Sequence, residues 1–338
     1  MNGVLKTQAQ YYNDTSTYTG EGGTETNKAV IEDVYDLVTW VNITTNQPET
    51  FAITTHKQYA VIVNDINFNV HETMKFGVTT AFLDMYFGGS GGDLDGGGHS
   101  ILNCVVNTNS PTASTGIIAR GTIHNTNFKN LVVIGARSNT QPVLSKITLN
   151  RCNFSIYMST TGFRSVFGQG ASGAGNGSVF NDCTFNVTGS VTENVIFYGL
   201  YLTANRCLFA FSDLHILSTT TNQLIQGVSS TYFNSCGFIG LISQTGNTST
   251  LSYWVGGNIA NSYIAIRNTA ISNYAGTGSG AYTSIHSTST SYLKVTGILA
   301  IDNELLGGSS SDTTNVKYMT TANMKNKTAM QGIGFVTI

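Results

Sequence analysis

A short phrase recurs eight times along the chain, and it constrains the fold more than any other feature of the sequence. Each copy has six positions. They hold an apolar residue, usually Asn, a polar residue, Cys or a substitute, any residue, and a second apolar residue, as in Leu149–Phe154. The fourth position recurs at intervals of 22 to 38 residues. It is filled by Ile66, Cys104, Thr126, Cys152, Cys183, Cys207, Cys236 and Tyr263. A repeat of this length indicates stacked structural units.

The spacing within the phrase predicts that each unit contains a β-strand. The fourth and sixth positions are two residues apart, so in an extended strand they lie on one face, and the residue between them points away. No copy lies in an apolar pattern of helical period. We therefore expect an all-β, single-stranded parallel β-helix whose coils stack about 4.8 Å apart. Its predicted core ladder comprises Ile66, Cys104, Cys152, Cys183, Cys207, Cys236, Phe68, Phe128, Phe154, Phe185, Phe209 and Phe238.

The asparagine of the phrase is interpreted as a turn residue. It stands where the apolar phase changes, because the residue before it is also apolar. Asparagine tolerates left-handed φ angles, and its amide can bond the coils above and below. The predicted turn ladder comprises Asn64, Asn150, Asn181, Asn205, Asn234 and Asn261.

Four segments resemble a known family. Asn64–Phe68 followed by Leu94–Ile101 (Leu-Asp-Gly-Gly-Gly-His-Ser-Ile) is similar to the opening of pectin-lyase-like surface β-helices, including those with a Gly-Leu-any-Gly motif. Gly237–Gly240 resembles one copy of that motif, and the C-terminal segment from Thr320 to Phe335 also looks like theirs. The resemblance implies a right-handed parallel β-helix, as in phage spike proteins, and it implies fold far more than function.

The ends of the chain are expected to differ from the coils. Residues 1–27 are polar and are predicted to form an arm. Residues 28–57 are predicted to hold a capping helix and lead-in, with Thr26 or Asn27 as N-cap and an apolar face including Val34 and Leu37. Residues 58–306 are predicted to form the parallel β-helix, and residues 307–338 a linker, a short helix and a strand. A solenoid needs such covers over its open strand edges.

Composition excludes several functions. Only 10% of residues are charged, the net charge is -2, and the 16 Lys and Arg residues are scattered, so nucleic-acid binding is not expected. No apolar run reaches the length of a membrane span, and no export signal precedes the coils. The five cysteines are odd in number and lack a CxxC pair, which favours buried free thiols over metal ligands. No cofactor or metal is predicted.

Catalysis is weakly indicated. Enzymes of this fold that cut polysaccharides need clustered carboxylates, and between Gly96 and Ile301 the acidic residues are Asp182, Glu193 and Asp213. Asp182 and Asp213 are the weak catalytic candidates, as neighbours on one surface strip. The preferred interpretation of Asp182 is a salt-bridged surface ladder with Arg151 and Arg206.

The remaining acidic group is Asp84, Asp93 and Asp95. His124, which replaces Asn in one coil, is interpreted as a hydrogen-bonded turn residue.

Three functions remain open. The first is a non-enzymatic structural protein of a virus particle: a tailed-phage spike, fibre, or head or tail decoration, assembled in the host cytoplasm as a homotrimer. Its expected partners are other virion proteins and host surface glycans, without nucleic acid or membrane insertion. The second is a polysaccharide depolymerase tailspike, against which the sparse carboxylates count. The third is a bacterial adhesin or ice-binding protein at the cell surface, which the missing export signal disfavours.

Overall fold

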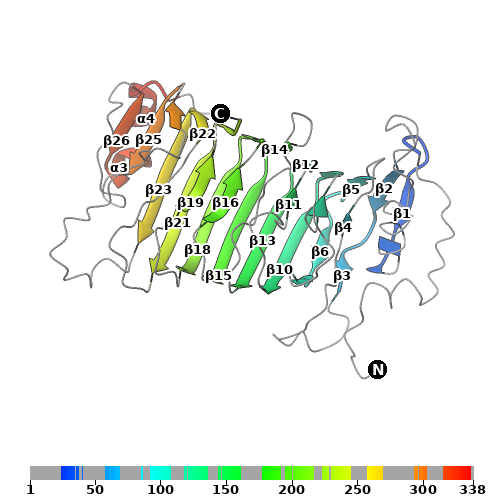
Figure 1. Ribbon diagram of the computed structural model, residues 1–338. Coiled ribbons are helices and arrows are strands. Elements are labelled where there is room, and N and C mark those ends of the chain that lie inside the picture. The colour runs from blue at the N-terminus through cyan, green and yellow to red at the C-terminus, as the bar shows by residue number, and fades with distance from the viewer. Residues whose placement is uncertain are drawn as a thin grey trace.

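The computed structural model shows a parallel β-solenoid, and the predicted all-β parallel coil is confirmed (Figure 1). Successive strands stand side by side from the N-terminal to the C-terminal end of the molecule. The structure describes residues 24–34, 36–37, 40, 58–68, 85–86, 92–107, 118–119, 121–135, 144–145, 147–160, 177–191, 195–199, 201–216, 223–227, 230–244, 257–268, 293–295, 297–302 and 315–335. Residues 1–23 of the predicted arm (1–27) lie outside these residues.

Each coil contributes strands to up to three parallel sheets. Sheet A has ten strands in the order β1 (Ala29–Ile31), β2 (Gln58–Ile62), β5 (Gly92–Asp95), β9 (Thr122–His124), β12 (Thr148–Asn150), β14 (Ser178–Asn181), β17 (Leu202–Asn205), β20 (Tyr232–Asn234), β22 (Gly257–Ala260) and β24 (Leu293–Val295). Sheet B has eleven: β3 (Ile66–Asn67), β6 (Ser100–Leu102), β7 (Val105–Asn107), β10 (Asn127–Gly135), β13 (Asn153–Thr160), β15 (Thr184–Val191), β18 (Leu208–Ile216), β21 (Gly237–Gln244), β23 (Ser262–Asn268), β25 (Leu299–Asp302) and β26 (Val316–Met319).

Shorter strands make the third side. β4 (Met85–Tyr86), β8 (Ile118–Ala119) and β11 (Leu144–Ser145) form a three-stranded sheet, and β16 (Val195–Gly199) pairs with β19 (Gln223–Gly227).

In-register pairing places like residues on top of one another. Phe154 pairs with Phe185, and Phe185 with Phe209. Their rings stack at centroid separations of 5.2 and 5.3 Å, within the range that favours offset aromatic pairs. The stack runs from Phe128 to Phe238 and is buried throughout. Period-2 alternation of apolar and polar residues therefore produces one continuous core along the axis.

The five cysteines do not share one column. Cys152, Cys183, Cys207 and Cys236 follow one another between sheets A and B, where each carbonyl accepts an N–H from the next coil. Cys104 is also buried, but it follows Asn103 at a second corner between β6 and β7. Cys104 therefore lies further along the coil than the other four, because the phrase encodes the same local turn at two different corners.

The first and last copies of the phrase are also displaced from their predicted positions. Ile66 pairs with Ile101, which pairs with Phe128, so Ile66 occupies the phenylalanine column and not the cysteine position. Phe68 is buried but lies beyond that column. In the last copy the register is shifted by one residue, because Asn234 pairs with Ala260 and Phe238 with Ile264. Ser262, not Tyr263, therefore takes the cysteine position.

The N-terminal segment begins with a strand where a helix is predicted. Ala29–Ile31 pairs with Ala60–Ile62, which rules out Thr26 or Asn27 as the helix N-cap. The helical residues are Val34, Asp36, Leu37 and Trp40, and the N–H of Asp36 donates to Asp33 Oδ1 at 3.0 Å. Asp33 therefore takes the capping role. Val34, Leu37 and Trp40 are buried in the main core.

The C-terminal segment adds a strand and two short helices. β26 extends sheet B beyond residue 306, and α3 (Thr321–Met324) and α4 (Lys327–Gly332) follow it. Thr320 and Asn326 cap these helices through their side-chain oxygens. Met330 packs with Ala300 and Met319. Part of the predicted final strand, residues 336–338, lies outside the described residues.

Candidate functional site

The polar residues gather at the corner between sheets A and B. In four successive coils the residue with left-handed φ is Arg151, Asp182, Arg206 or Ser235, with φ between 53° and 55°. The preceding asparagines are the last residues of their sheet A strands. The left-handed conformation predicted for those asparagines is therefore wrong, since it belongs to the residue that follows them.

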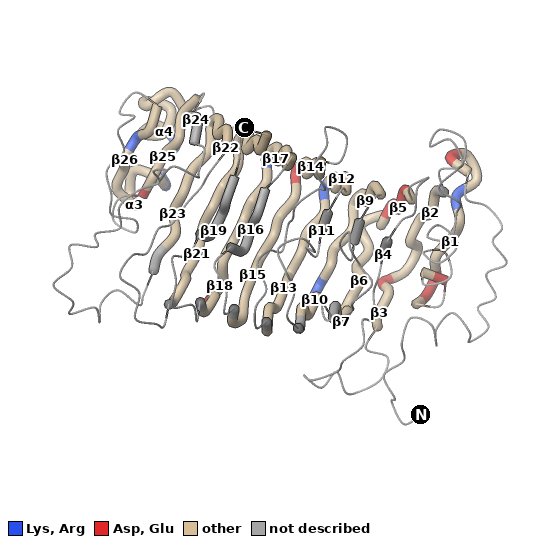
Figure 2. Tube along the Cα trace, in the orientation of Figure 1, with Lys and Arg blue, Asp and Glu red and all other residues tan. Residues whose placement is uncertain are grey.

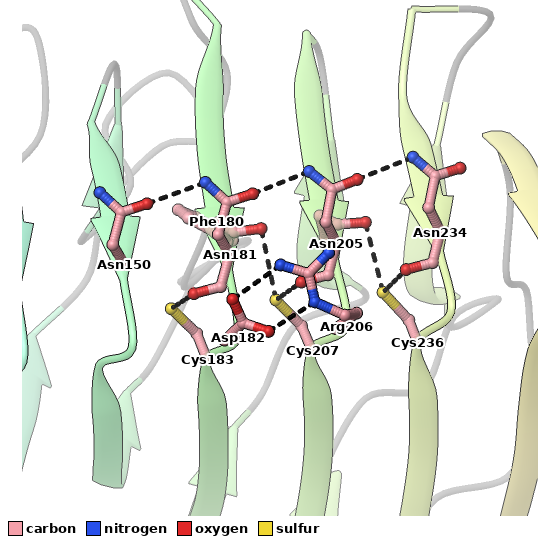
Figure 3. A network of polar contacts seen from close by, with 11 residues as sticks. Asn150, Phe180, Asn181, Asp182, Cys183, Asn205, Arg206, Cys207, Asn234 and Cys236 are labelled. Atoms are coloured by element: carbon pink, nitrogen blue, oxygen red, sulfur yellow. Dashed lines mark hydrogen bonds and ion pairs between the residues drawn. The ribbon is translucent and has the colours of Figure 1, made fainter. Parts of the chain in front are cut away.

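The asparagine amides form a ladder along the axis (Figure 3). Asn234 Nδ2 donates to Asn205 Oδ1 at 2.9 Å, Asn205 to Asn181 at 2.8 Å, and Asn181 to Asn150 at 2.8 Å. Asn64 lies outside the ladder, since its amide donates to the Glu32 carbonyl. Asn261 lies outside it too, with a left-handed φ of 48°. Four of the six predicted asparagines are thus brought together.

His124 and Asp93 terminate this ladder. His124 pairs with Asn150 in the sheet register, and Asn150 Nδ2 lies 3.1 Å from His124 Nδ1. The other ring nitrogen, Nε2, lies 3.1 Å from Asp93 Oδ1. Because Nδ1 accepts from the amide, Nε2 carries the proton and donates to Asp93. The chain of bonds therefore has one direction, from Asn234 toward Asp93.

The buried thiols take part in the same corner as hydrogen-bond donors. Cys207 Sγ lies 3.4 Å from the Asn205 carbonyl and 3.5 Å from that of Phe180. Thr126 and Ser262 fill the same position with hydroxyls that donate to the carbonyl two residues earlier. At the second corner, between β6 and β7, burial raises the pKa of the Cys104 thiol, so that thiol stays protonated. The position selects a small side chain with a donor, and not only a small hydrophobe.

Asp182, a weak catalytic candidate, is engaged in an ion pair. Arg206 donates to it from Nε at 2.6 Å and from the guanidinium NH2 group at 2.7 Å. The bonds from Arg206 hold the pKa of Asp182 below its usual value. Arg151 donates instead to Asn125 Oδ1 at 2.6 Å. The predicted three-residue ladder is therefore an Asp182–Arg206 pair beside an Arg151–Asn125 pair.

Asp213, the other candidate, lies on a different part of the coil. It has a left-handed φ of 60° at a bulge in β18, five residues beyond the start of that strand. Its Oδ1 lies 3.6 Å from His215 Nε2, and His215 Nδ1 bonds Ser243 Oγ on the next coil. Asp182 precedes β15, so the structure does not make the two aspartates neighbours.

A second acidic group lies near the N-terminal end of sheet A. Asp93 and Asp95 share the outer face of β5. Burial opposes ionisation of Asp95, but bonds from Asn125 and Gly97, together with Lys28 at 3.6 Å, lower its pKa. The third member of the predicted group, Asp84, lies outside the described residues. Charged residues are sparse along the middle strands (Figure 2).

The described residues form neither a metal-ligand cluster nor a membrane-spanning helix. They contain no group of three or more His, Cys, Asp or Glu side chains placed to hold a metal ion. None of their helices has the length and apolar character needed to cross a membrane.

Comparisons with known proteins give no family for the chain. No model of a known family matches it, and neither the curated proteins nor the solved structures compared with it contain a match.

Sequence reasoning missed the roles of two residues. His124 ends the amide ladder, and its place at the asparagine position of the phrase could have indicated this. Ser262 takes the cysteine position in its coil, but the one-residue register shift there makes this hard to predict from the sequence.

Proposed function

We propose that the chain is a non-enzymatic structural protein of a virus particle, of the kind that tailed phages use as spikes, fibres, or head or tail decorations. The observation that supports this most is that the polar groups at the corner between sheets A and B bond to neighbouring coils. Amides, thiols and the Asp182–Arg206 pair bond to neighbouring coils, so these groups stabilise a long coil. A rigid, nearly uncharged coil suits a surface component that contacts other virion proteins and host glycans.

The finer features of the proposed architecture follow from general rules. Connections between parallel strands of one sheet are almost always right-handed, so we infer a right-handed coil of the pectin-lyase-like kind. The helical residues from Val34 to Trp40 follow β1 at the first edge of sheet A and bury apolar side chains in the core. We infer that they cap the N-terminal end. A homotrimer, assembled in the host cytoplasm, is the proposed form on the particle.

Proteomics of purified particles tests this proposal. The gene is tagged in a virus-producing host, and particles are purified through a density gradient. We expect this chain to co-purify with the particles at a fixed ratio to the major capsid protein. Its absence from infectious particles would refute the proposal. Light scattering of the purified full chain then measures the expected trimer mass separately.

One observation favours a polysaccharide depolymerase as the second candidate. Asp93 and Asp95 lie two residues apart on one face of β5, which separates them by about 6.6 Å along a strand. Inverting glycosidases hold their two carboxylates about 6.5 to 9.5 Å apart. Incubation with host capsular or lipopolysaccharide glycans, followed by measurement of released reducing ends, distinguishes the candidates. Release that is lost in Asp93→Asn would favour the enzyme.

A further inference from the structure

The asparagine ladder has a direction that its own members do not determine. Within the described part of the chain, the amides of Asn150, Asn181, Asn205 and Asn234 bond only to one another and to His124. Rotating all four amides by half a turn exchanges each oxygen with its nitrogen, and it preserves the three bonds between them. The next residue in the column beyond Asn234 is Ala260, which has no amide. Only the contact with His124 distinguishes the two directions.

His124 imposes one direction while it is neutral. Its Nδ1 accepts from Asn150, and its Nε2–H donates to Asp93. When His124 binds a proton, both ring nitrogens become donors. The bond to Asp93 is kept and strengthened by charge. The contact with Asn150 then opposes a ring N–H to an amide N–H, which is repulsive.

Charged side chains lie on both sides of His124. Asp93 and Asp95 face it from β5, and Lys28 is engaged with Asp95 at 3.6 Å. On the other side, Arg151 follows β12 and donates to Asn125. Asp93 Oδ1 lies 3.1 Å from Nε2 and holds the ring in place, so Asn150, and not the imidazolium, is the group that must change.

We propose that His124 sets the direction of the asparagine ladder, and that protonation of His124 reverses the four side-chain amides together. After reversal, Asn150 Oδ1 accepts from His124 Nδ1–H, and each asparagine donates to the next one toward Asn234. The amide dipoles then present oxygen to the cation. At the far end of the ladder, Asn234 then presents its NH₂ group in place of Oδ1.

The test follows the asparagine side chains of the full chain by NMR with selective ¹⁵N-asparagine labelling, from about pH 8 to pH 5, the range in which histidines change charge. We expect the side-chain NH₂ resonances of Asn150, Asn181, Asn205 and Asn234 to shift with one midpoint, equal to that of the His124 imidazole. Asn130 is the internal control, since its row runs to Asn103 and Asn67 and contains no histidine.

Two variants decide the outcome. In Asn181→Ala the ladder is cut, so Asn150 should still shift with pH while the shifts of Asn205 and Asn234 are lost. In His124→Asn all four resonances should become independent of pH. The proposal is overturned if Asn234 does not move while His124 titrates, or if Asn205 and Asn234 still respond in Asn181→Ala. The test with Asn181→Ala does not depend on His124→Asn folding.

Discussion

At the scale of single residues, the corner between sheets A and B is defined by what each position must do. The first residue stacks an amide, the second adopts a left-handed φ, and the third donates from a small buried side chain. An arginine in the left-handed region costs energy relative to glycine, asparagine or aspartate. In Asp182 and Arg206 this conformation coincides with a bidentate ion pair.

Substitutions of Cys207 test the third position. Thr126 and Ser262 fill it in other coils, so Cys207→Ser should change the free energy of unfolding by less than about 1 kcal/mol. Cys207→Leu should lose about 1 to 3 kcal/mol, because a side chain with two more heavy atoms overfills a closely packed site. Urea unfolding of both variants measures the difference. Equal losses of unfolding free energy in the two variants would show that the site requires neither a small side chain nor a hydrogen-bond donor.

The ion pair gives a prediction of pH dependence. The lowered pKa of Asp182 means that the folded state holds the carboxylate more strongly than the unfolded chain does. The stabilisation is therefore complete at neutral pH and is lost as the pH falls below the ordinary value of 3.8. A double-mutant cycle of Asp182→Asn and Arg206→Gln should show a small coupling at pH 7 that disappears in acid. A coupling that grows in acid would contradict this.

At the scale of elements, the bulges of sheet B limit which residues a strand can hold. Gly189 has a φ of 104° opposite Met158, and an added Cβ would lie 2.1 Å from the Met158 carbonyl oxygen. Gly189→Ala should therefore cost at least about 2 kcal/mol. Gly332→Ala in α4 is the matched control, since a Cβ there meets nothing within 4 Å. Thermal unfolding should separate the two variants clearly, and similar midpoints would show that β15 relaxes around the methyl group.

The strands also show how much of the fold could be predicted from the sequence. The alternation around Phe154, Phe185 and Phe209 predicts both strand type and stacking, because in-register pairing follows from the repeat itself. Cys104 was placed wrongly, since two corners of the coil use the same apolar, left-handed and donor residues. Ile66 was also placed wrongly, since it pairs with Ile101 in the phenylalanine column and residues 63–68 contain no left-handed turn. The strand at Ala29–Ile31 was missed because its apolar residues also fit a helical face. The pairing of Asp213 with His215 depends on a bulge that has no sequence signature.

At the scale of the whole molecule, each coil pairs with its two neighbours, so whole coils should be removable. Asn153 pairs with Thr184, and Phe154 with Phe185. Deleting residues 154–184 joins Asn153 to Phe185 and removes one repeat while keeping the register. We expect a folded protein with native-like circular dichroism and a modestly lower unfolding temperature.

A deletion one residue shorter is the matched control. Removing residues 154–183 places Thr184 where Phe154 stood, which reverses the inward and outward faces of the joined strand. This variant should fail to fold or should aggregate. If both deletions behave alike, the stacking of coils does not depend on register as the structure implies.

The orientation of the backbone hydrogen bonds has a mechanical consequence. In both large sheets these bonds join one coil to the next, so they lie along the long axis of the molecule. Tension between the two ends loads the coils in series, and the weakest coil yields first while the others stay intact. Compression along the same axis presses each coil onto the next. The molecule should therefore resist compression along its long axis and unfold one coil at a time under tension.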